Sequence, residues 1–191
     1  MLTTQWRFEM LGHFCAKQED IHLTRFRTQK TAALLAYLVY FAQRSHSREE
    51  LAEKLWADQE KNAARNSLRV ALASLRSQLE PPGTPSGSVL ITDRTFLRLN
   101  PESILSDVTE FEAALHTARR FAATDSAQTV SALKSAVALY QGELLPGFYE
   151  DWVLTERERL ANGYHDALRT LIKLSLQSKD RPLALDMTLR S

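Results

Sequence analysis

The sequence is poor in the residues that build covalent, metal or catalytic sites. Its single cysteine, Cys15, excludes an intrachain disulfide and fits a protein of the reducing cytoplasm. The five histidines lack the spacing of metal ligands, and the six glycines form no phosphate-binding loop. We therefore expect no enzyme activity, no metal and no cofactor.

Long apolar runs are also missing. The longest, Ala32 to Ala42, has eleven residues, which suits a buried helix and is too short to cross a bilayer. Residues 1–6 contain no basic segment followed by an apolar one, so they do not resemble a signal peptide. These absences favour a cytoplasmic protein without a membrane partner.

A net charge of only +1 conceals an asymmetry between the two halves of the chain. Residues 1–100 contain 14 Lys and Arg against 10 Asp and Glu, whereas residues 101–191 contain 10 against 13. A basic first half and an acidic second half suggest two modules with different partners. The apolar fraction of 44% is sufficient to bury a core.

The first half of the chain predicts an α+β domain. Three short runs with strand-like content are expected to form a small antiparallel sheet: Arg7–Leu11, His13–Lys17 and Ile21–Phe26. Three helices are expected next, the first capped by Thr28 and the second opened by a capping box at Ser47: Thr28–Phe41, Ser47–Trp56 and Asn62–Leu79. A proline- and glycine-rich break then precedes a hairpin with strands Val89–Thr92 and Phe96–Leu99.

The third helix of this half has the composition of a DNA-binding element. From Lys61 to Gln78 it contains four Lys or Arg residues and no acid. At about 100° per residue its apolar residues form one stripe, which is expected to face the core: Ala64, Leu68, Ala71, Leu72, Leu75 and Leu79. The opposite face offers small, polar and cationic side chains, as a helix in a DNA major groove does. The alternative is an amphipathic helix with a solvated basic face.

Four residues on that outer face predict contacts with bases. Asn66 and Arg69 are suited to bidentate hydrogen bonds with adenine and guanine. Val70 is placed to touch a thymine methyl, and the small Ala73 lets the helix approach the duplex closely.

Neighbouring cations are expected to reach the DNA backbone. Arg65 and Arg76 fall on the flanks of the third helix, where phosphate contacts position a protein without reading sequence. Arg94 is at the tip of the hairpin and is expected to reach the minor groove or a phosphate, with a solvated turn arginine as the alternative. The order helix, helix, hairpin is that of a winged helix.

The second half of the chain predicts helices only. After an expected linker at Pro101–Ser106, apolar periodicity indicates a helical-repeat array: Asp107–Phe121, Asp125–Tyr140, Asp151–Leu176 and a further helix from Arg181 to Ser191. The expected domains are therefore 1–104 and 107–191. Because the last helix has no closing partner, the second domain is expected to be incomplete.

Two stretches resemble a known family. QKTAALLAYLVYFAQRSHSREELAEKLWADQEKNAARNSLRVALASLRSQLE, with the LITDRTFLRLN hairpin, resembles the OmpR/PhoB-type winged helix in the form found in the Streptomyces antibiotic regulatory proteins. GELLPGFYEDWVLTERERLANGYHDALRTL resembles the bacterial transcriptional activator domain that follows it in that family, an array of tetratricopeptide-like helix pairs. The conjunction covers nearly the whole chain.

The resemblance implies an activator of transcription. Such proteins bind direct repeats in double-stranded DNA near promoters, often as head-to-tail dimers, and recruit RNA polymerase. By position, the resemblance places Arg48 and Trp56 near the DNA backbone and Arg94 in the wing. The wing departs from the family pattern, because its turn has Asp93-Arg94-Thr95 where the family usually has a glycine before an aromatic residue.

One other class of function is open at this point. The winged helix could have lost DNA binding, leaving a protein-interaction adaptor in which the acidic helical array binds a partner. The small positive excess of the first half permits this reading.

Overall fold

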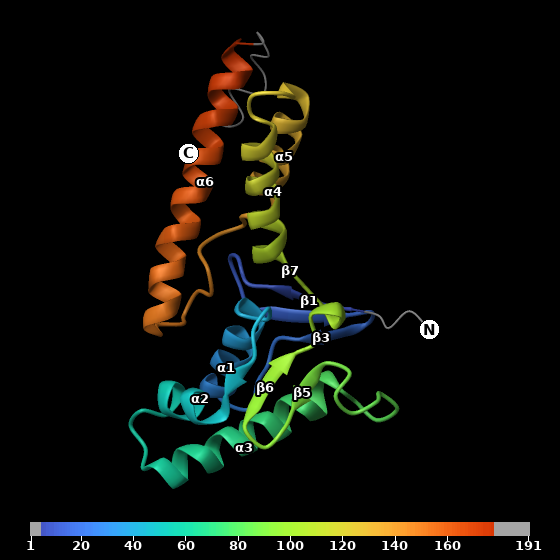
Figure 1. Ribbon diagram of the computed structural model, residues 1–191, viewed down its shortest axis with the longest axis vertical. Helices are drawn as coiled ribbons and strands as arrows, with labels where there is room; N and C mark the ends of the chain where they lie inside the picture. Colours follow the sequence, from blue (N-terminus) through green and yellow to red (C-terminus); the bar gives the residue numbers. More distant parts are fainter. Residues whose placement is uncertain (1–4, 178–191) are drawn as a thin grey trace. The chain divides into compact units, whose positions relative to one another are not determined.

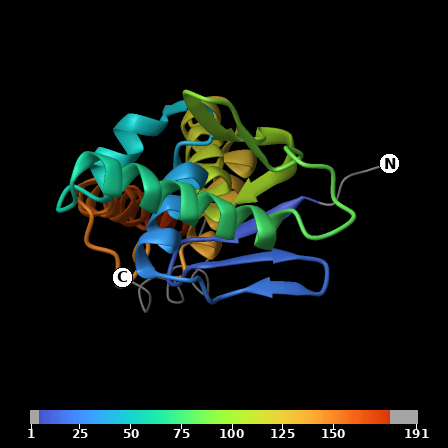
Figure 2. The same ribbon diagram turned by 90° about the horizontal axis from the view of Figure 1, so that it is seen from below.

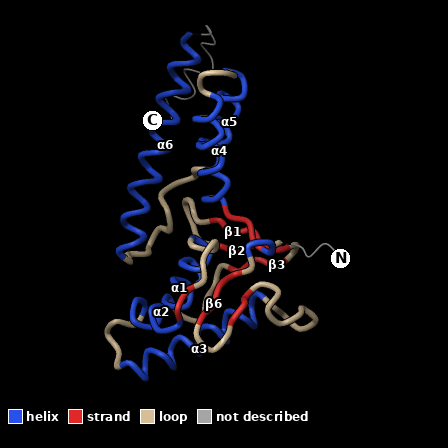
Figure 3. The backbone as a smooth tube through the Cα atoms, viewed as in Figure 1, coloured by secondary structure: helices blue, strands red, loops and turns tan. Residues whose placement is uncertain are grey.

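The computed structural model describes residues 5–177 (Figures 1 and 3). Its contacts divide the chain into two units: Met1–Phe8 with Cys15–Ser106, and Glu9–Phe14 with Asp107–Ser191. The first unit contains both strands and helices, and the described part of the second contains helices joined by turns and loops, together with the short segment 9–14. The helix expected at 181–191 lies outside the described residues.

The first unit contains a four-stranded sheet in the order β3-β2-β1-β7. Its strands are β1 (Trp6–Glu9), β2 (Cys15–Gln18), β3 (Ile21–Leu23) and β7 (Ile104–Ser106). β2 and β3 are antiparallel, but β7 pairs parallel to β1, with Trp6 opposite Ile104. The expectation of a purely antiparallel three-stranded sheet is therefore wrong.

The expected linker at 101–106 is also wrong. Pro101–Ser103 forms a 3₁₀ turn (η1), and Asn100 Oδ1 caps it by accepting from Glu102 N at 3.2 Å. β7 follows at once. Three residues are too few to show an alternating pattern, and the partner strand lies almost a hundred positions away, so nothing local in the sequence indicates this pairing.

The first predicted strand extends too far, because its last residues make other hydrogen bonds. Met10 N and Leu11 N donate to Asp107 Oδ2 at 2.8 and 2.9 Å, and not to a neighbouring strand. β1 therefore ends at Glu9, and β2 begins at Cys15, beyond the turn at 10–14.

Three helices complete the first unit, as predicted: α1 (Gln29–Tyr40), α2 (Arg48–Leu55) and α3 (Lys61–Leu79). Thr28 Oγ1 accepts from Thr31 N at 3.1 Å, and Ser47 Oγ accepts from Glu50 N at 3.5 Å, so both predicted caps are confirmed. The predicted apolar stripe of α3 is buried in full: Ala64, Leu68, Ala71, Leu72, Leu75 and Leu79. Figure 2 shows α3 along its length at the surface that faces the viewer.

The predicted hairpin consists of β5 (Leu90–Thr92) and β6 (Phe96–Leu99), but it belongs to a larger sheet. A two-residue strand, β4 (His46–Ser47), pairs with β6 and gives the order β4-β6-β5. Ser47 therefore has two roles, since its backbone pairs with Phe96 and its side chain caps α2. This pairing fixes the start of α2 against the hairpin.

A buried carboxylate joins the end of α3 to the hairpin. Glu80, the C-cap of α3, has a side chain only 2% exposed. Its Oε1 accepts from Gly87 N at 3.1 Å, Val89 N at 2.9 Å and Leu90 N at 2.8 Å, and its Oε2 lies 3.3 Å from Arg76 Nε. Burial alone would raise the pKa of Glu80, but these backbone donors and Arg76 hold the pKa below its usual value.

The second unit contains three helices within residues 107–177: α4 (Asp107–Phe121), α5 (Ser126–Leu139) and α6 (Asp151–Gln177). Figure 1 shows α5 beside α4, and α5 also contacts α6. Their shared core consists of buried side chains from all three helices: Ala118, Ala132, Leu133, Val137, Ala167, Leu168 and Leu171. An all-helical second part is thus confirmed.

Residues 9–14 belong to the second unit because their backbone forms hydrogen bonds with the connection between α5 and α6. Leu11 bridges to Leu144, and Gly12 N donates to Glu143 O at 2.9 Å. Gly12 has a φ of +92°, and a Cβ on Gly142 would lie 2.9 Å from Gly12 Cα, so both positions require glycine.

Arg157 of α6 holds the connection between α5 and α6. Its guanidinium donates to the carbonyl oxygens of Leu144, Leu145 and Phe148 at 2.9, 2.9 and 3.1 Å. Leu145 has a φ of +48°, which is unfavourable for a branched side chain and is maintained by these bonds.

We expect Glu80→Gln to lower the free energy of unfolding of the first unit by about 1–3 kcal/mol at neutral pH, because the buried N–H donors lose an ionised acceptor. The lowered pKa means that this stabilisation is fully present above pH 4.5 and is lost as the pH falls through the folded-state pKa. The difference between the two proteins should therefore shrink on acidification. Urea unfolding followed by tryptophan fluorescence in a Trp152→Phe background reports on Trp6 and Trp56 of the first unit alone. A constant difference at all pH values would contradict this account.

Candidate nucleic-acid interface

The outer face of α3 presents the predicted base-reading residues to solvent. Asn66, Arg69 and Ala73 are exposed, and Val70 is half-buried. Arg69 Nη2 donates to Asn66 Oδ1 at 2.9 Å, so the two predicted base readers hold each other one turn apart. Such a pair offers adjacent donor and acceptor groups to a surface that approaches the helix.

The N-terminal turns of α3 are cationic but partly neutralised. Arg65 Nη2 donates to Glu49 Oε1 at 3.1 Å, and Lys61 Nζ contacts the same oxygen. The connection before α3 is held by Ser67 Oγ, which donates to Gln59 Oε1 at 2.8 Å. The start of α3 is thus tied both to α2 and to the preceding turn.

Three residues that are predicted to contact the DNA backbone lie around one groove. Arg48, Arg65 and Arg94 line an open hollow of about 320 Å³, together with Ser47, Glu49, Leu68 and Thr95. They come from α2, α3 and the turn of the hairpin, so the tertiary fold gathers them from positions far apart in the chain. Three arginines and one glutamate therefore line the same hollow, and guanidinium groups are donors suited to anions such as phosphate.

An aspartate closes the turn of the hairpin without a glycine. Asp93 Oδ1 accepts from Thr95 N at 2.6 Å and Phe96 N at 2.7 Å, and Asp93 N donates to Phe96 O at 3.0 Å. These backbone donors, with the charge of Arg48, lower the pKa of Asp93. The departure from the family pattern is therefore compensated by an Asx-type turn, in which Arg94 is exposed at the tip.

Arg48 supports the same turn. Its backbone N donates to Thr95 O at 2.9 Å and its guanidinium donates to Asp93 O at 3.0 Å. Trp56, the other residue placed near the DNA backbone by the resemblance, is only 6% exposed.

Arg76 differs from the other predicted phosphate contacts. Its Nη2 donates to Leu90 O at 3.0 Å and to Thr92 Oγ1 at 2.8 Å, and its Nε pairs with Glu80. The guanidinium therefore attaches β5 to α3. A phosphate contact by Arg76 stays a prediction, and the bonds that the structure gives it are internal to the protein.

The outer face of β6 carries two residues that the sequence reasoning did not single out. Phe96 is 47% exposed and Arg98 is exposed, while Leu97 and Leu99 between them are buried. The alternation along the predicted strand already implied that residues 96 and 98 point outward. The hairpin thus exposes two arginines, Arg94 and Arg98, and one aromatic ring.

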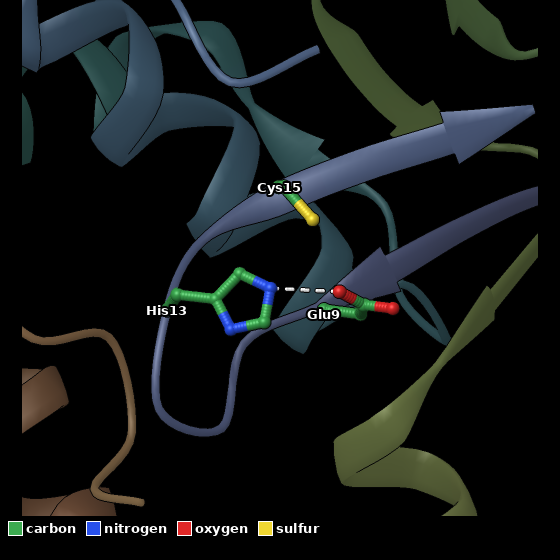
Figure 4. A group of neighbouring side chains, drawn as sticks. All are labelled: Glu9, His13 and Cys15. Carbon is green, nitrogen blue, oxygen red and sulfur yellow. Dashed lines mark hydrogen bonds and ion pairs between the residues drawn. The ribbon is translucent and has the colours of Figure 1, made fainter. Parts of the chain in front are cut away.

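Away from this surface, two side chains with metal-binding chemistry pair with each other. Figure 4 shows His13 and Glu9 of the second unit joined through His13 Nε2 and Glu9 Oε2 at 2.7 Å. Cys15, the third residue drawn, is buried in the first unit. Among the helices within residues 5–177, none has the length and hydropathy that crossing a bilayer requires.

Comparison with known proteins finds two domains. Residues 18–96 match the family described as transcriptional regulatory protein, C terminal, and residues 106–187 match the bacterial transcriptional activator domain. Among solved structures, Mycobacterium tuberculosis EmbR in complex with a low-affinity phosphopeptide aligns with a TM-score of 0.73 and 22% identity, over 91% of this chain and 46% of that one. This likeness concerns the fold, and the chain spans less than half of the EmbR chain. No curated protein matches the sequence.

A winged helix followed by this second domain defines a DNA-binding transcriptional regulator. The chain is of the Streptomyces antibiotic regulatory protein type, with an OmpR/PhoB-type winged helix ahead of a bacterial transcriptional activator domain. Neither domain belongs to a catalytic family.

We expect Asp93→Ala to loosen the turn of the hairpin, because Thr95 N and Phe96 N lose their shared acceptor. Hydrogen exchange should show faster exchange of these two amides, with little change in the buried part of α3. Asp93→Asn keeps an acceptor oxygen and should retain most of the protection. Equal exchange in wild type and Asp93→Ala would show that the aspartate does not hold the turn.

Proposed function

We propose that this regulator is a cytoplasmic activator that binds direct repeats near promoters as a homodimer and recruits RNA polymerase. Residues 1–104 would form the DNA-binding domain, and residues 107–191 the part that meets protein partners. The domain order supports this proposal, and the acidic second half suits contact with proteins more than with DNA.

The proposal assigns base reading to the middle of α3. Asn66 and Arg69 supply hydrogen-bond groups for adenine and guanine, Val70 an apolar contact, and Ala73 the space for close approach. The observation that carries the assignment is the exposure of Asn66, Arg69 and Ala73 on the face opposite the buried stripe. The hollow lined by Arg48, Arg65 and Arg94, called the arginine groove below, includes residues of the same helix.

The proposal assigns contacts with DNA phosphates to the residues around the groove. Arg48, Arg65 and Arg94 surround a hollow that suits one phosphate of the DNA backbone, and Trp56, the C-cap residue of α2, is buried. Arg76 has a different assignment in this proposal: it holds β5, so that the hairpin keeps its position beside α3.

Selection of bound duplexes from a random pool tests the proposal directly. Recovery of a direct repeat supports both sequence-specific binding and tandem assembly. Retention of a protein partner with no duplex bound at low salt would replace the proposal by the adaptor function.

We expect Arg69→Ala to weaken binding to the selected duplex by roughly 1–3 kcal/mol and to relax base preference at one position, because a bidentate base contact is lost. Arg119→Ala, at an exposed position of α4, removes the same charge from the second unit and should leave affinity unchanged. Titration of each variant with selected and mixed-sequence duplexes gives the comparison. Unaltered base preference in Arg69→Ala would remove Arg69 from the reading face.

We expect Ala73→Leu to reduce binding to every duplex at least tenfold, because the larger side chain keeps α3 away from the base edges. Ala73 is exposed, so the fold should tolerate the change. Ala113→Leu, also at an exposed helical position, is the matched control in α4. Full binding by Ala73→Leu, with unchanged circular dichroism, would place this part of α3 outside the groove.

A further inference from the structure

Acidic side chains of α2 contact the first turns of α3. Glu49 Oε1 accepts hydrogen bonds from Lys61 Nζ and from Arg65 Nη2, the latter at 3.1 Å. Glu53, one turn further along α2, has an oxygen 3.9 Å from Lys61 Nζ. These side chains are between 48% and 65% exposed, so their ion pairs are hydrated and exchange readily with other ions.

Glu49 lies in the arginine groove itself. It lines the hollow together with Arg48, Arg65 and Arg94. A carboxylate and a phosphate offer the same kind of acceptor to a guanidinium group, so they compete for the same donors. Lys61 and Arg65 are also the first two cations of α3, the helix with no acid of its own up to Gln78.

We propose that Glu49 is an internal counterion that competes with DNA phosphate for Arg65 and Lys61, and thereby lowers affinity for every duplex and reduces its dependence on salt. This inference rests on the proposed DNA binding. It adds to that function a residue of the groove, Glu49, that opposes DNA binding.

Counterion release determines the sign of both effects. A free cation that meets a phosphate releases one condensed counterion from the DNA, and each release steepens the fall of affinity with salt. A cation already paired with Glu49 must first leave it, and the carboxylate then takes up a cation from solution. The net release is smaller, so wild type binds more weakly and with a shallower salt slope than a protein lacking this carboxylate.

The carboxylate remains charged under binding conditions. Hydrogen bonds and charge from Lys61, and then from Arg65, lower the pKa of Glu49. Competition with phosphate therefore operates at neutral pH.

The test compares Glu49→Gln with Glu53→Gln, which removes the same charge from the same helix but lies farther from Lys61. Affinity for a selected duplex and for a mixed-sequence duplex is measured over a salt series. We expect Glu49→Gln to bind both duplexes several-fold more tightly at low salt, with a slope steeper by about 0.9 for each additional counterion released. Glu53→Gln should change both quantities less.

A double-mutant cycle separates competition from a general charge effect. The comparison is repeated in a protein that carries both Lys61→Gln and Arg65→Gln. In this background, adding Glu49→Gln should raise the affinity for duplex no more than adding Glu53→Gln does. Circular dichroism of each variant verifies the fold.

The outcomes distinguish this inference from the proposed function. If wild type binds duplex but Glu49→Gln binds equally or more weakly, Glu49 positions Arg65 for DNA and the inference is overturned. If neither protein retains duplex at low salt, the proposed function fails and takes the inference with it. Duplex binding by Glu49→Gln alone would support competition by Glu49 and would contradict DNA binding as the function of the wild-type protein.

Discussion

The carboxylate of Glu80 connects the third helix to the hairpin that follows it. It is buried at the C-terminal end of α3 and receives backbone N–H groups from Gly87, Val89 and Leu90. Arg76 completes the arrangement from one turn earlier, by pairing with Glu80 and donating to Leu90 O and Thr92 Oγ1. Buried donors without an acceptor cost about 1–3 kcal/mol each, so this carboxylate is difficult to replace. Recognition by a winged helix needs α3 and the hairpin in a fixed relation, and these bonds supply it.

Cations near α3 thus have two different states in the free protein. Arg76 is bonded to the backbone and to a buried acid, and is a structural residue. Arg65 is paired with an exposed acid in hydrated surroundings, and in the proposed competition a phosphate would displace that acid. The same residue type on the same helix therefore serves the fold in one place and is available to a ligand in the other.

Asp107 and Arg157 organise the second unit in a similar way. Asp107 accepts from the backbone of Met10, Leu11 and Val108, although burial raises the pKa of its carboxyl group. Arg157 donates to three carbonyl oxygens of the connection before α6. In both cases one side chain satisfies several backbone groups that have no partner in a regular element.

The helices could be predicted from the sequence, because they depend on apolar periodicity and on local capping residues. The stripe of α3 and the caps Thr28 and Ser47 were predictable, because each depends on residues within one or two turns. Exposure of Asn66, Arg69 and Ala73 followed from the same periodicity, although their contacts with DNA stay predictions.

Only the tertiary structure decided the pairings between distant segments. β7 beside β1, β4 beside β6 and the groove of Arg48, Arg65 and Arg94 join residues that share no local pattern. The partners of Arg65 and Arg76 were also decided by the tertiary structure. Helix geometry gave both arginines the same flank position, but the fold placed the exposed acid Glu49 beside Arg65 and the backbone of β5 beside Arg76. A sequence pattern specifies which face of an element is polar, but the neighbour that meets this face depends on how the chain closes over long separations.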